Sequence, residues 1–197
     1  MRIQIENVEV SNFLSFGKKP QQISFSNNLY LITGENKSTK RKNFIGKTNL
    51  LESIVWGLYG KTIKNIKKAD IINWKNRKKC VVKINFSIGN NKYKIIRGIK
   101  PDIFEIYLNE ELIDQLSSNT DMQNFLEDKI LQLDYKTFVG LIYSNPNNTP
   151  SIFDMPKPQK RKILENLFSL DSYSELNKKA AQANELRRQK DLYFAGT

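Results

Sequence analysis

The chain has 197 residues, 39% of them hydrophobic, which is enough to bury a substantial core. Its formal net charge is +12, from 32 Lys and Arg residues against 20 Asp and Glu residues. Such a charge attracts polyanions such as DNA. The alternative is that the positive charge only reflects a composition rich in Lys, Asn and Ile, which would arise whatever the partner. One cysteine and no histidine exclude a disulfide framework and the common cysteine- and histidine-based metal sites. No apolar run approaches the roughly 20 residues that cross a bilayer and no signal-peptide pattern is present, so we expect a cytoplasmic protein with no membrane partner.

The N-terminal third of the sequence predicts three strands and one helix. The strands are expected at residues 3–10, 23–25 and 29–33, with a polar turn containing aromatic residues between the first two. After Thr48, apolar residues recur at helical spacing and Gly60 is placed to end the helix. The residues expected on its buried face are Leu50, Leu51, Ile54, Val55 and Leu58.

The segment from Gly34 to Thr48 has the layout of a phosphate-binding P-loop, because a strand and a glycine precede Gly46-Lys47-Thr48 at the start of a helix. In such a loop, backbone N–H groups at the helix N-terminus surround a polyphosphate. Lys47 would reach the β- and γ-phosphates, and the Thr48 hydroxyl would ligate Mg²⁺. The predicted cofactors are therefore ATP and Mg²⁺.

The spacing of this motif departs from the usual one. Four residues normally separate the first glycine from the Gly-Lys pair, whereas eleven separate Gly34 from Gly46. In one register, residues 34–36 begin the loop and residues 37–44 form an inserted basic excursion. In the other, residues 43–48 form a compact loop, which puts Phe44 where glycine is usual and makes a positive φ costly.

The middle of the chain predicts a hairpin and a third strand. Strands are expected at residues 80–88, 92–97 and 103–108, with a turn at Gly89-Asn90-Asn91, after a basic and irregular stretch at 61–79. Alternation along the first of these strands predicts a sheet with one solvated face. Cys80 is expected to be a small core residue.

Helices dominate the remainder. They are predicted near 120–131 and 135–143, with Asp134 as the N-cap of the second. Four prolines exclude continuous helix from 144 to 158. A further helix is expected from about 159 to 170, and Ser172 with Glu175 forms a capping box that opens a last polar helix.

Several of these segments, in this order, resemble the N-terminal ATPase half of Rad50/SbcC-like proteins of the SMC family, and are most similar to phage recombination and exonuclease subunits. The segments that carry the resemblance are 8–17, 49–60, 66–73, 93–98 and 161–171. It implies an α/β fold, the N-terminal lobe of an ABC/SMC-type P-loop ATPase head, with a mixed sheet around the P-loop helix. Residues 1–170 would form this lobe, and residues 171–197 the truncated beginning of a coiled-coil helix.

The resemblance also implies a set of site residues. The nucleotide-binding residues would be Gly34, Asn36, Asn43, Gly46, Lys47, Thr48, Asn49, Asn73 and Trp74. Thr48 and Asn145 would ligate Mg²⁺, although Asn145 stands where the family has a glutamine and Leu14 where it often has a basic residue. Two interpretations of Trp74 stay open, which are stacking on a base and ordinary packing in the core or on the surface. No Walker B or signature motif is present, so the chain by itself is expected to contain no catalytic residue and to be nearly inactive.

The implied partners are DNA bound independently of sequence, an Mre11/SbcD-like nuclease subunit near residues 159–190, a C-terminal ATPase half, and a second head that closes on ATP. The leading hypothesis is an ATPase subunit that acts with the nuclease in DNA end processing, recombination and repair, in the host cytoplasm if a phage encodes it. The alternatives are an SMC-like, nucleotide-gated DNA clamp without a nuclease role, and a degenerate fragment that acts only as a basic DNA-binding module.

Overall fold

The computed structural model describes residues 2–35, 38–40, 42, 46–141, 156–158, 160–161 and 164. The chain divides into two compact units, Met1–Leu131 and Gln132–Thr197. The boundary expected between residues 170 and 171 lies outside the described residues.

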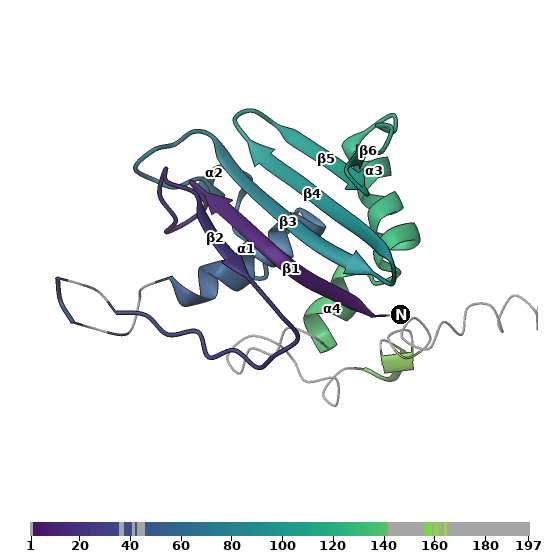
Figure 1. Cartoon of the computed structure of the whole chain (residues 1–197), viewed down its shortest axis with the longest axis horizontal. Coiled ribbons are helices and arrows are strands. Elements are labelled where there is room, and N and C mark those ends of the chain that lie inside the picture. The colour runs from purple at the N-terminus through teal and green to yellow at the C-terminus, as the bar shows by residue number, and fades with distance from the viewer. Residues whose placement is uncertain are drawn as a thin grey trace, which may run out of the picture. The chain divides into compact units, whose positions relative to one another are not determined.

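A six-stranded sheet forms the frame of the first unit (Figure 1). Its strand order is β2-β1-β3-β4-β5-β6, and every pair of neighbouring strands is antiparallel. The sheet that the resemblance implied to be mixed is therefore antiparallel throughout the described part. The strands are β1 (Ile3–Ser11), β2 (Gln21–Ser24), β3 (Cys80–Ile88), β4 (Asn91–Ile99), β5 (Ile103–Leu108) and β6 (Glu111–Leu112).

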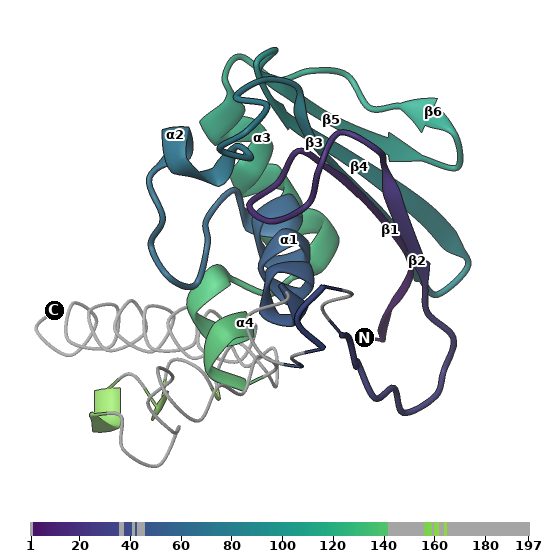
Figure 2. The ribbon, with the colours of Figure 1, turned by 90° about the vertical axis from the view of Figure 1, so that its left-hand side faces the viewer.

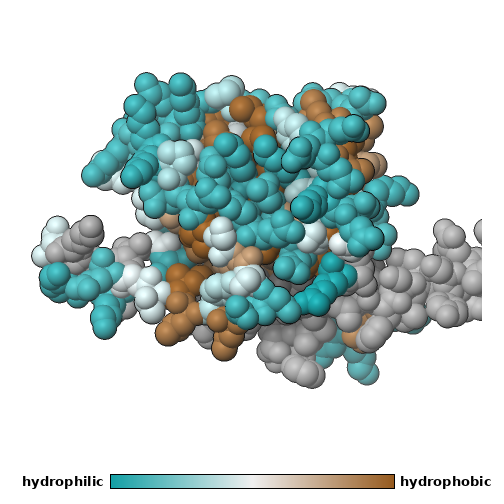
Figure 3. All heavy atoms as spheres, viewed as in Figure 1, coloured by the Kyte–Doolittle hydropathy of each residue, from teal (hydrophilic) through white to brown (hydrophobic). Residues whose placement is uncertain are grey.

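The alternation read from the sequence of β3 holds in the structure. Cys80, Val82, Ile84 and Phe86 are buried, while the residues between them are half-buried on the other face. That other face is mostly hydrophilic (Figure 3). The hairpin to β4 closes through Gly89, which has a φ of 59°, and Ile88 pairs with Asn91. Burial raises the pKa of the Cys80 thiol to about 12, as expected for an unreactive core cysteine.

Helices cover the apolar face of the sheet (Figure 2). The helix α1 (Lys47–Tyr59) contacts β3 and β4, and α3 (Asn119–Phe125) continues directly into the π-helix η1 (Leu126–Leu131). The short helix α2 (Lys68–Ile71) lies within the stretch that was expected to be irregular. One turn of helix is too short for a periodic apolar pattern, which is why the sequence did not indicate it.

The predicted end of α1 is confirmed. Gly60 is its C-cap, has a φ of 67°, and donates its N–H to the Trp56 carbonyl at 2.7 Å. Leu50, Ile54, Val55 and Leu58 are buried as expected. Leu51 is 38% exposed, so its place on the buried face was wrong. Polar Glu52 and Ser53 occupy buried positions instead, because α1 packs on more than one side.

The strand predicted at residues 29–33 does not form. Leu29 is fully exposed, Leu31 is 89% exposed, and no described strand pairs with this segment. An apolar run becomes a strand only where a neighbour supplies partners for its backbone N–H and C=O groups. The described residues supply none here.

In the second unit, α4 (Tyr135–Leu141) begins where the sequence predicted a helix. The Asp134 side chain accepts a hydrogen bond from the Thr137 N–H at 2.9 Å, which confirms the N-cap. The predicted proline-containing loop, the capping box and the coiled-coil helix lie mostly or wholly outside the described residues. No helix in the described part of the chain has the length and apolar character to cross a membrane.

Candidate nucleotide-binding site

The site predicted from Gly46-Lys47-Thr48 lies at the N-terminus of α1. Gly46 is the N-cap residue and has a φ of 84°, a left-handed conformation that favours glycine. A Cβ added there would overlap with the Ser15 hydroxyl. Gly46 has no side chain to cap this helix end, and the first turn of α1 contains no acidic residue. The first turn therefore supplies no carboxylate that would compete with an anion for its N–H groups and for the positive end of the helix dipole.

Lys47 and Thr48 are both exposed, as a phosphate and metal site requires. The Lys47 ammonium donates a hydrogen bond to the Lys42 carbonyl at 3.1 Å, so the end of the inserted segment lies within reach of the lysine. Gly34 is half-buried in irregular backbone before the insertion. Asn36, Asn43 and Asn145 lie outside the described residues, so the choice between the two registers of the loop stays a prediction.

Ser15 is a site residue that the sequence did not single out. The Asn49 side-chain amide donates to the Ser15 hydroxyl at 2.8 Å, which fastens the turn after β1 to the first turn of α1. Ser15 is exposed beside Gly46, so its hydroxyl lies at the rim of the predicted phosphate site. The available signal was its place in the 8–17 segment that carries the family resemblance.

Asn73 holds the other side of the same turn. Its side-chain amide donates to the Leu14 carbonyl at 2.7 Å, and its N–H donates to the Asn12 carbonyl at 2.8 Å. Its side-chain oxygen accepts from the N–H groups of Lys75 and Asn76 at 3.2 and 3.3 Å. Asn73 is only 5% exposed, so the structure shows a residue that positions the turn. A direct contact with nucleotide stays a prediction.

The turn at Leu14 is strained in a way that suits this anchoring. Leu14 has a φ of 47°, and its N–H donates to the Ile71 carbonyl at 2.7 Å. Trp74, the residue after Asn73, is 71% exposed and so does not lie in the core. Whether it stacks on a base or is an ordinary surface residue stays a prediction. The structure thus links the start of α1, the turn after β1 and the segment after α2 into one assembly.

Glu52 is buried within α1, and one of its carboxylate oxygens accepts from the Ile63 N–H at 2.9 Å. The other oxygen is buried and has no hydrogen-bond partner among the residues that the structure describes. Burial raises the pKa of the Glu52 carboxyl, against the opposing effects of the Ile63 N–H and the Lys64 charge. This carboxyl ties the chain after α1 to the helix that carries the candidate site.

A cavity of about 360 Å³ lies at the opposite end of α1. Gly60, Arg97 and Phe104 contribute to its lining, together with the Lys68–Asp102 ion pair at 2.9 Å. The Arg97 guanidinium donates to the Gly57 carbonyl at 3.1 Å and to the Gln123 side chain at 2.6 Å, so it caps the C-terminal end of α1. This cavity is separate from the predicted phosphate site.

Comparisons with known proteins agree with this architecture. A family model described as an AAA domain matches residues 7–193. Exonuclease subunit 2 of Escherichia phage RB69 is 31% identical over 94% of this chain and 32% of that protein. The DNA double-strand break repair Rad50 ATPase of Sulfolobus acidocaldarius is 24% identical over 79% of this chain and 17% of that protein.

Among solved structures, the Smc head domain of Pyrococcus furiosus, with an extended coiled coil and bound to the C-terminal domain of ScpA, aligns with a TM-score of 0.63. It is 21% identical and covers 92% of this chain and 46% of that one. This likeness confirms the predicted fold, the N-terminal lobe of an ABC/SMC-type ATPase head. The chain spans at most about a third of the length of the two sequence relatives. With the family model matching nearly its whole length, the chain belongs to the AAA domain family and is a Rad50/SbcC-like member of it.

Proposed function

We propose that the chain is the ATP-binding N-terminal lobe of a Rad50/SbcC-like ATPase that acts with an Mre11-type nuclease in DNA end processing, recombination and repair. The observation that carries the proposal is the start of α1, where Gly46-Lys47-Thr48 stands at a helix end whose N-cap residue, Gly46, has no side chain. Backbone N–H groups, the helix dipole and the Lys47 ammonium all favour a polyphosphate at this point.

Each residue of the site has a distinct role in this proposal. Lys47 leaves the Lys42 carbonyl and neutralises the β- and γ-phosphates. The Thr48 hydroxyl would hold the Mg²⁺ that accompanies ATP, with Asn145 as a second proposed ligand. The ion would neutralise part of the negative charge of the phosphates. Ser15 and Asn49 hold the turn after β1 against the phosphate loop, and Asn73 fixes that turn from behind.

Residues 29–33 support the proposal that a C-terminal ATPase half completes this lobe. Leu29 and Leu31 are apolar and exposed, and no strand of the described residues pairs with residues 29–33, which lie directly before the phosphate loop. Such a run buries its side chains and satisfies its backbone once a partner strand lies beside it. The relatives are at least about three times as long as this chain, which leaves ample length for such a half. Hydrolysis by the isolated lobe is expected to be very slow, because a general base and a signature motif would come from other segments.

The name of the phage relative, exonuclease subunit 2, supports a nuclease partner, which we propose docks near residues 159–190. The fold is shared with SMC ATPases, for which ATP-driven dimerization is described, and this supports pairing of two heads on ATP. It is also the observation that favours the second candidate, a DNA clamp without a nuclease role. Co-purification with an Mre11-type nuclease distinguishes the two functions.

Isothermal titration with ATP and Mg²⁺ tests the nucleotide site. Lys47→Ala is expected to abolish binding without unfolding the protein, since Lys47 is exposed and points away from the core. Lys92→Ala is the matched control, because Lys92 is also an exposed lysine and lies on β4. Equal affinities in Lys47→Ala and wild type would remove Gly46-Lys47-Thr48 as the phosphate site, and an absence of ATP binding in wild type would favour the degenerate-fragment alternative.

A further inference from the structure

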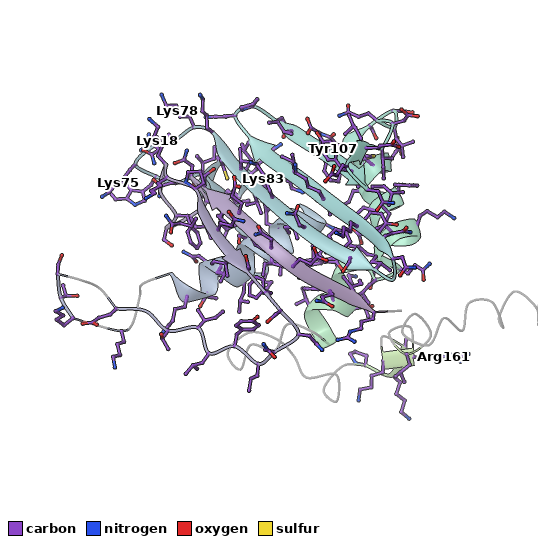
Figure 4. The ribbon with its side chains drawn as sticks, viewed as in Figure 1. Lys18, Lys75, Lys78, Lys83, Tyr107 and Arg161 are labelled. Atoms are coloured by element: carbon purple, nitrogen blue, oxygen red, sulfur yellow. The ribbon has the colours of Figure 1, made fainter. Side chains whose placement is uncertain are left out.

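One corner of the first unit gathers six exposed cations, which we call the basic corner: Lys18, Lys19, Lys75, Arg77, Lys78 and Lys79. Lys18, Lys75 and Lys78 are labelled in Figure 4, where they lie together at one end of the sheet. The two segments that supply the six, 12–19 and 74–79, contain no Asp or Glu. Within the part of the chain that the structure describes, the ion pairs involve other lysines. Like charges held together without a counter-charge favour binding of a polyanion.

Hydrogen bonds hold the two segments of the basic corner against each other. The Asn12 side chain is the centre of this network, and Asn12 is only 4% exposed. Its amide donates to the Lys79 carbonyl at 3.1 Å, and its oxygen accepts from the Asn76 amide at 2.7 Å. The Asn12 N–H donates to the Gly17 carbonyl at 2.9 Å, which closes the turn that leads to Lys18. The cations therefore stand on backbone that is already positioned, which reduces the entropy lost on binding.

Trp74 adjoins these cations and adds an exposed aromatic ring to the surface. Its side chain is 71% exposed, the Lys75 ammonium lies 5.3 Å from the centre of its ring, and the Arg77 guanidinium donates to its carbonyl at 3.2 Å. An exposed indole beside cations is the combination by which proteins bind single-stranded nucleic acid, since bases stack on the ring and phosphates pair with the cations.

We infer that the basic corner binds single-stranded DNA, with Trp74 stacked on an unpaired base and the surrounding Lys and Arg residues paired with the adjacent phosphates. The inference rests on the proposed function, which makes DNA the substrate. Trp74 favours a single strand over a duplex. Bases within an intact duplex are already stacked on one another, so they offer no free face on which the indole could stack. The cations alone would bind either form.

Binding of an oligothymidine of about 16 nucleotides, a length that covers one such site, and of a blunt duplex of equal length tests the inference. Fluorescence anisotropy is measured on the full 197-residue chain. Trp74→Ala is expected to weaken single-strand binding by about 5- to 160-fold, the range that base stacking supports, and duplex binding by less than about twofold. Oligothymidine should also quench indole fluorescence in wild type and not in Trp74→Ala, because the other tryptophan, Trp56, is buried. Single-strand affinity unchanged in Trp74→Ala would overturn the inference.

A pair of charge-reversal variants tests the cations. Lys75→Glu with Lys78→Glu should weaken binding of both DNA forms, and the salt dependence should become shallower, since each lost phosphate contact lowers the log–log slope by about 0.7 for a single strand. Lys92→Glu with Lys94→Glu, on exposed positions of β4, changes the net charge by the same amount and is the matched control. An equal loss in both pairs would show an effect of net charge alone and refute the assignment to the basic corner.

ATP titration of the Lys75→Glu and Lys78→Glu pair separates this inference from the proposed function, because neither lysine is among the predicted nucleotide-binding residues. If the basic corner acts as inferred, this pair loses DNA and keeps wild-type ATP affinity. If wild type itself binds no ATP, the proposed function fails, while the DNA measurements still decide the basic corner.

Discussion

Replacement of Gly57 by alanine tests how closely the helix that carries the candidate site packs on the sheet. Gly57 lies within α1, and a Cβ there would overlap with the Ile84 Cδ1 atom. It would also lie 3.1 Å from the Ile84 Cγ1 and Val82 Cγ1 atoms. Both side chains are fully buried, so neither has open space to enter. We expect α1 to move away from β3, taking Gly46-Lys47-Thr48 with it.

Two opposing effects set the magnitude. Overpacking of a well-packed core costs about 1 to 3 kcal/mol. Alanine in place of glycine inside a helix recovers roughly 1 kcal/mol. The net expectation is a loss of about 1 kcal/mol in the free energy of unfolding. Removal of the obstructing Cδ1 by Ile84→Val costs about 0.5 to 1.5 kcal/mol alone. In that background, Gly57→Ala should become neutral or stabilising by up to roughly 1 kcal/mol.

Urea denaturation of wild type, both single variants and the double variant measures this reversal of sign, with the fluorescence of Trp56 in α1 as the probe. Gly17→Ala is the control, because its added Cβ would meet nothing within 4 Å. The reasoning is refuted if Gly57→Ala stabilises the otherwise unchanged protein, or if its effect is the same with valine at position 84. A loss of ATP affinity that accompanies the destabilisation and is restored in the double variant would connect the packing to the site.

Three further outcomes are expected. The raised pKa of Glu52 means that the folded state holds its proton more tightly than the unfolded state does, so its contribution to stability is present at low pH and is lost as pH rises through the raised value. Glu52→Gln should therefore flatten the fall of the urea midpoint above the ordinary pKa of glutamate, and identical pH profiles would contradict the assignment. Shortening the inserted segment to a six-residue connection between Asn36 and Gly46 should preserve or improve ATP binding in a calorimetric titration. Residues 37–42 have no apolar side chain to bury, and their four cations repel one another. Complete loss of ATP binding in a protein that still folds would make the insertion part of the site. Tyr173→Asp with Leu176→Asp should abolish co-purification with the nuclease and spare ATP binding, and recovery of the nuclease at the wild-type level would place its docking surface elsewhere.

Local patterns in the sequence were sufficient to predict many of the strands, helices and helix ends of this fold. The alternation in β3, the glycine that ends α1 and the aspartate that begins α4 all act through neighbours within a few residues. Their conformations follow from the chemistry of short segments, so they could be predicted one segment at a time. The Gly46-Lys47-Thr48 motif belongs to the same class, because its glycine and helix start are adjacent in the chain.

Features that depend on residues far away in the sequence could be found only from the tertiary structure. Residues 29–33 have the composition of a strand, but a strand exists only beside another one, and the described chain provides none. Ser15 reaches the site through Asn49, which is 34 residues away, and Asn73 serves that site by holding a turn 59 residues earlier in the chain. The six cations of the basic corner come from two segments that are far apart in the sequence and that hydrogen bonds of the Asn12 side chain hold together. Composition determines how many cations the chain carries, whereas the fold determines where their fields add.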